Sequence, residues 1–251
     1  MRSLCWCSAA ALLVLAGCGG RHARDPFAYD RARPLGTRDQ GVALSGPKAA
    51  MHVVSYDAAT RVNAFVVVPP TGGKHPAVLF LHGSGGNRED LLLPAIELAS
   101  RGFVTMTISQ PNDSTTFRPL VVNARRALDL LGARKDVDSA RLGLVGYSLG
   151  GQTAAILAGD EPRLKAIGIV AGRGSTTPLY WIGKAHAHLY FQAGTKDEVV
   201  PHAQLVALIR AAPDHPLVRW YATGHGMSRQ AFDDQIAWQA REIGFRPHGG
   251  H

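Results

Sequence analysis

Cysteine is scarce in this chain of 251 residues, which contains only Cys5, Cys7 and Cys18. All three lie close to the N-terminus, so a disulfide framework for the rest of the chain is excluded. Aromatic residues account for 7% of the sequence and charged residues for 18%, whereas 46% of the residues are hydrophobic. This hydrophobic fraction is enough for a full core at this length, which excludes a disordered, collagen-like or coiled-coil protein.

Acidic residues are too few to balance the basic ones, since 19 Asp and Glu stand against 27 Lys and Arg, for a net charge of +8. The basic residues are scattered along the chain, with neither a basic stripe nor a motif for stacking on bases. The charge excess is therefore interpreted as a solvated surface, and no nucleic-acid partner is expected.

Motifs for metals and cofactors are absent as well. The sequence has no H-E-x-x-H, no Cys and His cluster for zinc, no phosphate-binding G-x-x-x-x-G-K and no dinucleotide fingerprint. Two histidines near the end, His248 and His251, lie in what we interpret as a tail over residues 247–251. Neither a metal nor a cofactor is expected.

A short apolar run begins the chain. Residues 9–16 follow Arg2 and end in small residues, the layout of a secretory signal, and the run is shorter than the roughly 20 apolar residues that span a bilayer. Residues 15–18, Leu-Ala-Gly-Cys, resemble the lipobox of bacterial lipoproteins. The resemblance implies a signal peptide over residues 1–17 and a lipidated Cys18 that anchors the exported protein to a membrane of the bacterial cell envelope. An ordinary secretory signal that leaves Cys18 as a free thiol is the alternative.

The next segment, residues 18–40, is rich in Gly, Pro and Arg. Its composition indicates a flexible tether after the lipidated cysteine, whose basic residues either face solvent or lie against anionic headgroups. We expect the folded domain to occupy residues 41–246.

Within that domain, apolar runs typical of strands alternate with helical patterns. The alternation predicts a single α/β domain with a mainly parallel central sheet and helices on both faces. Apolar residues at three- and four-residue spacings predict a helix over 120–131, which Gly132 ends. The other predicted helices cover 89–101, 152–158 and 203–212, and the predicted strands cover 62–68, 77–81, 103–108, 142–145, 166–170, 189–192 and 217–221.

Two Gly-rich motifs follow predicted strands. A G-x-S-x-G motif at 146–150 lies between a strand and a helix, the context of a nucleophile elbow with Ser148 as the nucleophile. Its glycines leave room for the sharp turn, and the backbone N–H of Leu149 would donate to an oxyanion. Residues 82–86, His-Gly-Ser-Gly-Gly, can turn further N–H groups toward the same oxyanion, or can form a plain flexible turn.

Together these motifs resemble the α/β-hydrolase superfamily, and within it the compact serine esterases similar to dienelactone hydrolases. The resemblance covers about residues 49–245 and implies a triad in the order Ser, acid, His. It places the acid at Asp197, in a loop after the strand 189–192, and the base at His225, on a Gly-flanked loop after the last strand. It also implies the N–H of Ser84 as the second oxyanion donor and a structural role for His82.

Three other acidic residues downstream of Ser148 are alternatives to Asp197 as the acid. Glu198 is adjacent to it in the sequence, and Asp214 and Asp233 are candidates that we interpret as surface residues. The sequence departs from the dienelactone hydrolases at one position, because they usually carry Cys where this chain has Ser148. Their lactone substrate is therefore not carried over, and a general serine esterase is favoured.

The segment 172–187 is where a lid would be inserted, and it is too short for a large cap domain. Its aromatics Tyr180 and Trp181 would either line an open acyl or alcohol pocket near Ser148 or pack against a helix. An open site favours small-molecule or polymeric esters over long chains that require an enclosed tunnel.

The sequence thus predicts a serine esterase that works through an acyl-enzyme intermediate. His225 would take the proton of Ser148, Asp197 would orient the imidazole, and backbone N–H groups would hold the oxyanion. A serine peptidase or an acyltransferase on the same triad is one alternative, because this scaffold hosts many reactions. A non-catalytic envelope lipoprotein that retains the fold is another.

Overall fold

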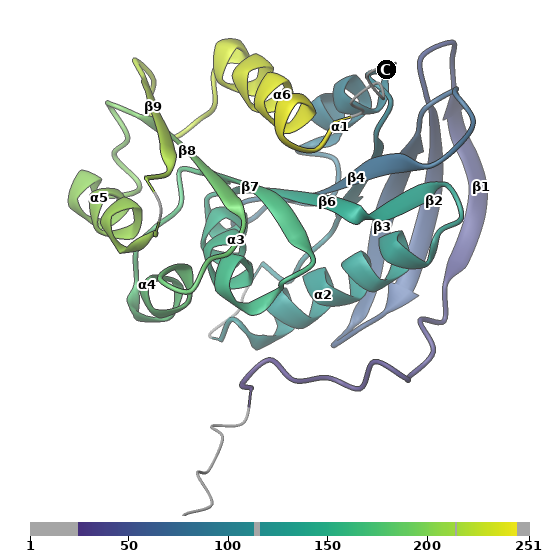
Figure 1. The fold of residues 1–251 in the computed structure, drawn as a ribbon, viewed down its shortest axis with the longest axis horizontal. Coiled ribbons are helices and arrows are strands. Elements are labelled where there is room, and N and C mark those ends of the chain that lie inside the picture. Colours follow the sequence, from purple (N-terminus) through teal and green to yellow (C-terminus); the bar gives the residue numbers. More distant parts are fainter. Residues whose placement is uncertain (1–24, 113–115, 214, 245–251) are drawn as a thin grey trace, which may run out of the picture.

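A computed structural model describes residues 25–112, 116–213 and 215–244 of the chain (Figure 1). The strands are β1 (Arg38–Ser45), β2 (Ala50–Asp57), β3 (Arg61–Val68), β4 (His75–Leu81), β5 (Val104–Ile108), β6 (Val137–Tyr147), β7 (Leu164–Val170), β8 (His188–Gly194) and β9 (Leu217–Tyr221). The helices are α1 (Leu92–Ala99), α2 (Arg118–Ala133), α3 (Leu149–Asp160), α4 (Thr176–Ile182), α5 (His202–Ala211) and α6 (Arg229–Ile243).

The described strands form one sheet in the order β1-β2-β3-β5-β4-β6-β7-β8-β9. Neighbours are parallel from β5 to β9, whereas β1, β2 and β3 run antiparallel at one edge and β3 is antiparallel to β5. Every residue of β4 and β5 is buried, as expected of parallel strands that are apolar at consecutive positions. The predicted mainly parallel sheet is confirmed.

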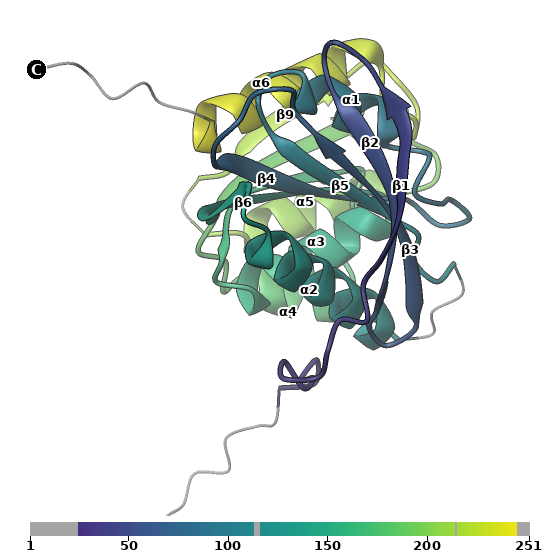
Figure 2. The same cartoon turned by 90° about the vertical axis from the view of Figure 1, so that its right-hand side faces the viewer.

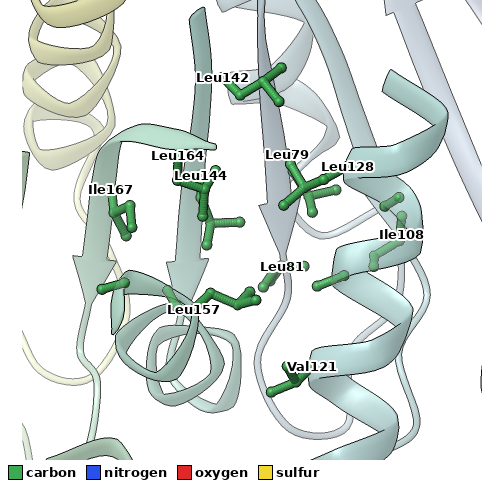
Figure 3. Packing of buried hydrophobic residues seen from close by; sticks show 14 of the residues in the cluster. Leu79, Leu81, Ile108, Val121, Leu128, Leu142, Leu144, Leu157, Leu164 and Ile167 are labelled. Carbon is green, nitrogen blue, oxygen red and sulfur yellow. The ribbon is translucent and has the colours of Figure 1, made fainter. Parts of the chain in front are cut away.

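Helices cover both faces of the sheet (Figures 1 and 2). Helices α1 and α6 cover one face, where Leu98 and Ile236 are buried, and α2, α3, α4 and α5 cover the other. Figure 3 shows the larger core, in which Leu128 of α2 and Leu157 of α3 pack toward Leu79 and Leu144 of the central strands. Each of these leucines is fully buried, so truncation of any one to alanine would cost about 2–5 kcal/mol.

The segment between β7 and β8 contains only the seven-residue helix α4. This confirms the expectation that no large cap covers the carboxyl ends of the strands. Four elements were not predicted, namely β1, β2, α4 and α6. The eight residues of β1 are all exposed, and β1 pairs only with β2, so its sequence carries no buried pattern.

The structure of residues 25–37 contradicts the prediction that this part of the chain is a flexible tether. Phe27 is buried, and the Tyr29 hydroxyl donates to Asp129 of α2 at 2.8 Å. The guanidinium of Arg126 donates to the carbonyls of Arg33 and Pro34 at 2.7 and 3.0 Å. The segment therefore packs on α2, because arginines of that helix bind the backbone carbonyls of a strap rich in Pro and Arg.

The predicted signal peptide, Cys18 and the predicted tail lie outside the described residues. The described part of the chain begins at Asp25 and β1 begins at Arg38, both ahead of the expected domain start at residue 41. In the ranges that the structure describes, none of the helices has both the length and the hydropathy needed to cross a bilayer.

Candidate active site

The site residues lie on loops that follow parallel strands. Strands β4, β6, β8 and β9 run in the same direction, so their carboxyl ends meet at one edge of the sheet. Ser148 directly follows β6, Asp197 lies in the loop after β8, and His225 lies in the loop after β9. Ser148 and Asp197, which lie 77 and 28 positions from His225 in the sequence, are thereby brought into contact with it, because loops at this edge converge.

The turn at Ser148 has the conformation of a nucleophile elbow. Its φ is 53° and its ψ is −110°, a strained combination for a residue with a side chain. A Cβ at Gly146 would collide with the carbonyl of Gly150, and a Cβ at Gly150 would collide with the carbonyl of Leu81. The two glycines of the motif are therefore required by close backbone approach on either side of the serine.

Three side chains form a connected hydrogen-bonded chain. The Oγ of Ser148 is 3.0 Å from Nε2 of His225, and Nδ1 of His225 is 2.8 Å from Oδ2 of Asp197. The side chain of Asp197 is 7% exposed and that of His225 is 18% exposed, so the acid is shielded while the base remains accessible. The structure thus brings together the predicted nucleophile, base and acid.

Asp197 is held as a carboxylate. Burial alone would raise its pKa, but the N–H of Val200, the His225 imidazole and the N–H of Val199 all favour the ionised form and hold the pKa below its usual range. The two backbone N–H groups donate to Oδ1 at 2.9 Å each, which leaves Oδ2 for His225. Among the alternatives, Asp233 is paired with Arg229 on α6, and Asp214 lies outside the described residues.

His82 fixes the loop that faces the nucleophile. The N–H of Gln110 donates to its Nε2 at 2.8 Å, so Nδ1 carries the proton and donates to the carbonyl of Gly83 at 2.6 Å. The backbone carbonyl of His82 also accepts from the N–H of Gly150 at 3.1 Å. His82 is 3% exposed, which agrees with its expected structural role.

Two backbone donors are available at the predicted oxyanion position. Among the described residues, nothing accepts a hydrogen bond from the N–H of Leu149 or of Ser84. Leu149 follows the nucleophile at the start of α3, where helix N–H groups have no partner within the helix. Both donors therefore remain candidates for the oxyanion hole.

The substrate-binding prediction for Tyr180 and Trp181 is wrong, because α4 packs at the far end of α3 from Ser148. The carbonyl of Trp181 contacts Gly159, which lies roughly ten residues or ~15 Å along α3 from the nucleophile. The Trp181 ring packs on Phe27 with centroids 5.7 Å apart, and Tyr180 is 60% exposed. The backbone of α4 thus packs on α3, whereas the Trp181 ring packs on the segment 25–37.

Sequence reasoning missed one contact of the base. The hydroxyl of Tyr147 donates to the backbone carbonyl of His225 at 3.1 Å. Tyr147 precedes the nucleophile in the elbow motif, but the motif does not indicate which atom its hydroxyl meets.

Within the described ranges, no group of three or more His, Cys, Asp and Glu side chains could hold a metal ion.

A serine, an imidazole and a carboxylate in this geometry, on a mainly parallel sheet covered on both faces, define the chain as an α/β-hydrolase with a Ser–His–Asp triad. The sequence model of the dienelactone hydrolase family matches residues 106–242, more than half of the chain. The chain belongs to the dienelactone hydrolase family.

Curated relatives of similar sequence are hydrolases, and solved structures share the fold. The chain is 33% identical over 171 residues to the bis(hydroxyethyl) terephthalate hydrolase of Streptomyces coelicolor, covering 62% of this chain and 53% of the relative. It is 31% identical over 159 residues to a cutinase of Thermobifida fusca, covering 58% and 47%. The chain spans about half the length of the curated relatives it matches. An acetyl xylan esterase from Paenibacillus sp. R4 shares the fold, with a TM-score of 0.72, 18% identity and coverage of 84% of this chain and 90% of that one.

Proposed function

We propose that this protein is a serine esterase that hydrolyses carboxylic esters through an acyl-enzyme intermediate. The observation that supports it most is the continuous chain of contacts from Ser148 through His225 to Asp197, at 3.0 and 2.8 Å. A free hydroxyl is too weakly acidic to attack an ester carbonyl unaided, so a base in contact with Oγ is the essential requirement.

Each side chain has a defined part in the reaction. His225 removes the proton of Ser148 as Oγ bonds to the carbonyl carbon, and Asp197 stabilises the imidazolium through Nδ1. The N–H groups of Leu149 and Ser84 stabilise the oxyanion, each contributing about 3 kcal/mol to lowering the barrier. His225 then protonates the alcohol as its bond to the acyl carbon breaks. Water attacks the acyl carbon with His225 again as base, and the bond to Oγ breaks as His225 returns the proton to Oγ and the carboxylic acid leaves.

The proposed substrates are small or polymeric esters. The cutinase and the bis(hydroxyethyl) terephthalate hydrolase are ester hydrolases by name, and both share about a third of their aligned residues with this chain. Helix α4 is the only helix between β7 and β8, it packs away from Ser148, and Ser148 itself is half-buried. This openness supports a substrate range that includes polymeric esters.

Hydrolysis of p-nitrophenyl acetate and butyrate tests the proposal. Wild-type protein should release p-nitrophenol, and Ser148→Ala should lower kcat/KM by about 10⁴-fold. Ser139→Ala, at an exposed position on β6, is the matched control and should retain full activity. A folded wild-type protein that cleaves neither ester would remove the basis of the proposal. Peptide substrates and an added alcohol acceptor, assayed in parallel, distinguish an esterase from a peptidase or an acyltransferase.

We also propose that the protein is exported and anchored to a membrane of the bacterial cell envelope through lipidated Cys18. The basis is the Leu-Ala-Gly-Cys sequence at residues 15–18 behind a short apolar run. Several acyl chains on one thiol-bearing terminus would give durable attachment, because each buried CH₂ contributes about 0.8 kcal/mol. Six residues lie in the sequence between Cys18 and Asp25, the first described residue, which pairs with Arg125 of α2 at 3.0 Å.

Cell fractionation tests the anchor. In a bacterial host, wild-type protein should sediment with membranes, and Cys18→Ser should appear in the soluble fraction. Cys7→Ser is the control, because residue 7 lies inside the proposed signal peptide and should not affect attachment. Equal membrane retention of all three proteins would contradict the anchor.

A further inference from the structure

Tyr147 immediately precedes the nucleophile Ser148 in the sequence, and its side chain contacts two loops of the site, residues 82–86 and residues 222–228. Its hydroxyl donates to the carbonyl of His225 at 3.1 Å, and its ring lies 5.3 Å from the imidazole at an interplanar angle of 42°. On its other side, a Cβ at Gly83 would lie 3.0–3.1 Å from the Tyr147 ring. One side chain therefore contacts both the loop that carries the base His225 and the loop 82–86, called the oxyanion loop because it carries Ser84.

The loop that carries the base has few other attachments. The N–H of Thr223 donates to the carbonyl of Tyr221 at 2.8 Å, and the N–H of Lys196 donates to the carbonyl of Thr223 at 2.9 Å. Beyond Thr223, the bond to Tyr147 is the only hydrogen bond made by the backbone of residues 224–227 within the described chain. Glycines flank His225 on both sides, so this peptide has unusual conformational freedom.

The hydroxyl is a permanent donor at neutral pH. Burial raises the pKa of Tyr147, and the nearby carboxylates of Asp197 and Asp90 raise it further, because each disfavours a phenolate. The hydroxyl therefore keeps its proton and remains able to donate to the His225 carbonyl at neutral pH.

We propose that Tyr147 is a positioning residue that holds His225 in place for catalysis. Because Tyr147 and Ser148 are consecutive, this hydrogen bond attaches the backbone of His225 to the same segment that carries the nucleophile. It keeps Nε2 3.0 Å from Oγ while the imidazole gains and loses a proton. A misplacement of about 1 Å at such a contact costs a large part of the rate. This inference rests on the proposed esterase function, since it concerns the base of that reaction.

Tyr147→Phe tests the proposal, because it keeps the ring against Gly83 and removes only the hydroxyl. The variant should lower kcat for p-nitrophenyl acetate about tenfold with KM within twofold, the size expected for one hydrogen bond and an orphaned carbonyl. Rates are normalised to active sites titrated to completion with a fluorophosphonate, so that loss of folded protein is not counted. Tyr29→Phe, which removes a hydroxyl bound to Asp129 at 2.8 Å on the strap, is the matched control and should keep wild-type kcat.

A spectroscopic readout separates positioning from general stability. The proton between His225 and Asp197 should give a downfield ¹H NMR signal in wild-type protein and in Tyr29→Phe. In Tyr147→Phe the signal should broaden or disappear, because a less restrained imidazole exchanges it faster. Wild-type kcat together with an unchanged signal in Tyr147→Phe would overturn the proposal. If wild-type protein itself has no esterase activity and no fluorophosphonate adduct, the proposed function fails instead.

Discussion

Replacing Asp197 with asparagine changes one atom of the site and should nearly abolish the reaction. The two backbone N–H groups of Val199 and Val200 donate to Oδ1 at 2.9 Å each. Because both are donors, the asparagine oxygen must stay at that position, and its NH₂ group must then face Nδ1 of His225. An NH₂ group cannot accept a hydrogen bond from a protonated Nδ1, so Nδ1 must be the acceptor and the imidazole carries its hydrogen on Nε2. In that tautomer Nε2 cannot accept the proton of Ser148.

The expected loss follows from these contacts. A charge-assisted hydrogen bond to the imidazolium contributes about 2 kcal/mol, and the unfavourable tautomer adds about 3 kcal/mol. At 1.36 kcal/mol per tenfold change, kcat/KM should fall between about 10³- and 10⁴-fold. The assay is hydrolysis of p-nitrophenyl acetate at neutral pH, with Asp233→Asn as the matched control for loss of a surface carboxylate. A folded Asp197→Asn protein within tenfold of wild type would refute this assignment of the acid.

The same variant makes a prediction about stability and pH. A carboxylate with a lowered pKa stabilises the fold above its unfolded-state pKa, and the stabilisation is lost as pH falls through the lowered value. The Tm difference between wild type and Asp197→Asn should therefore be largest near neutral pH and should shrink on acidification below about pH 4. A difference that grows toward low pH would contradict the direction of the pKa shift.

Further predictions concern Gly150 in the elbow, Asp160 at the end of α3 and His82 in the loop 82–86. Gly150→Ala should lower the free energy of unfolding in urea by about 2–4 kcal/mol, because its Cβ meets the Leu81 carbonyl, whereas Gly72→Ala, in open space, should not. Burial raises the pKa of Asp160 to about 6, so the stabilisation by this carboxyl should be lost as pH rises from 4 to 6, and the Tm of Asp160→Asn relative to wild type should rise over that range. A relative Tm that falls over that range would contradict the shift. His82→Ala should lower kcat about 10- to 100-fold by loosening the oxyanion loop, and an unchanged kcat would show that the loop does not need this ring.

Ser148 was accessible from sequence through the elbow motif, and the resemblance to the family's order of Ser, acid and His placed Asp197 and His225. Ser148 lies between a buried strand and a helix, and the glycines around it are required by backbone contact. His225 and Asp197 follow strands, and parallel strands deliver such loops to one edge. These signals depend on short-range sterics and on strand direction, which a sequence states directly.

Helix α6 was missed because part of its inward face is polar. Gln235 and Gln239 are buried over the sheet, where a Cβ at Gly168 would meet the Gln235 amide. Gln239 donates to the carbonyl of Leu144 at 3.2 Å. Glutamines that fill the space above strand glycines interrupt the apolar periodicity on which helix prediction depends.

The strap and the aromatics of α4 were misjudged for a related reason. The Pro- and Arg-rich composition of residues 25–37 is typical of a tether, and its carbonyls are bound by arginines of α2, about 90 residues away in sequence. Trp181 follows the elbow helix in sequence, but the sequence does not indicate at which end of α3 it packs. Long-range partners of this kind are set by tertiary structure alone.

Labelling with a fluorophosphonate tests the central claim most directly, because the probe reacts only with a serine whose proton a neighbouring base removes. Intact mass spectrometry of folded wild-type protein should show a single adduct, and peptide mapping should place it on Ser148. Absence of an adduct on folded wild-type protein, or an equal adduct on Ser148→Ala, would contradict the assignment of Ser148 as the activated nucleophile.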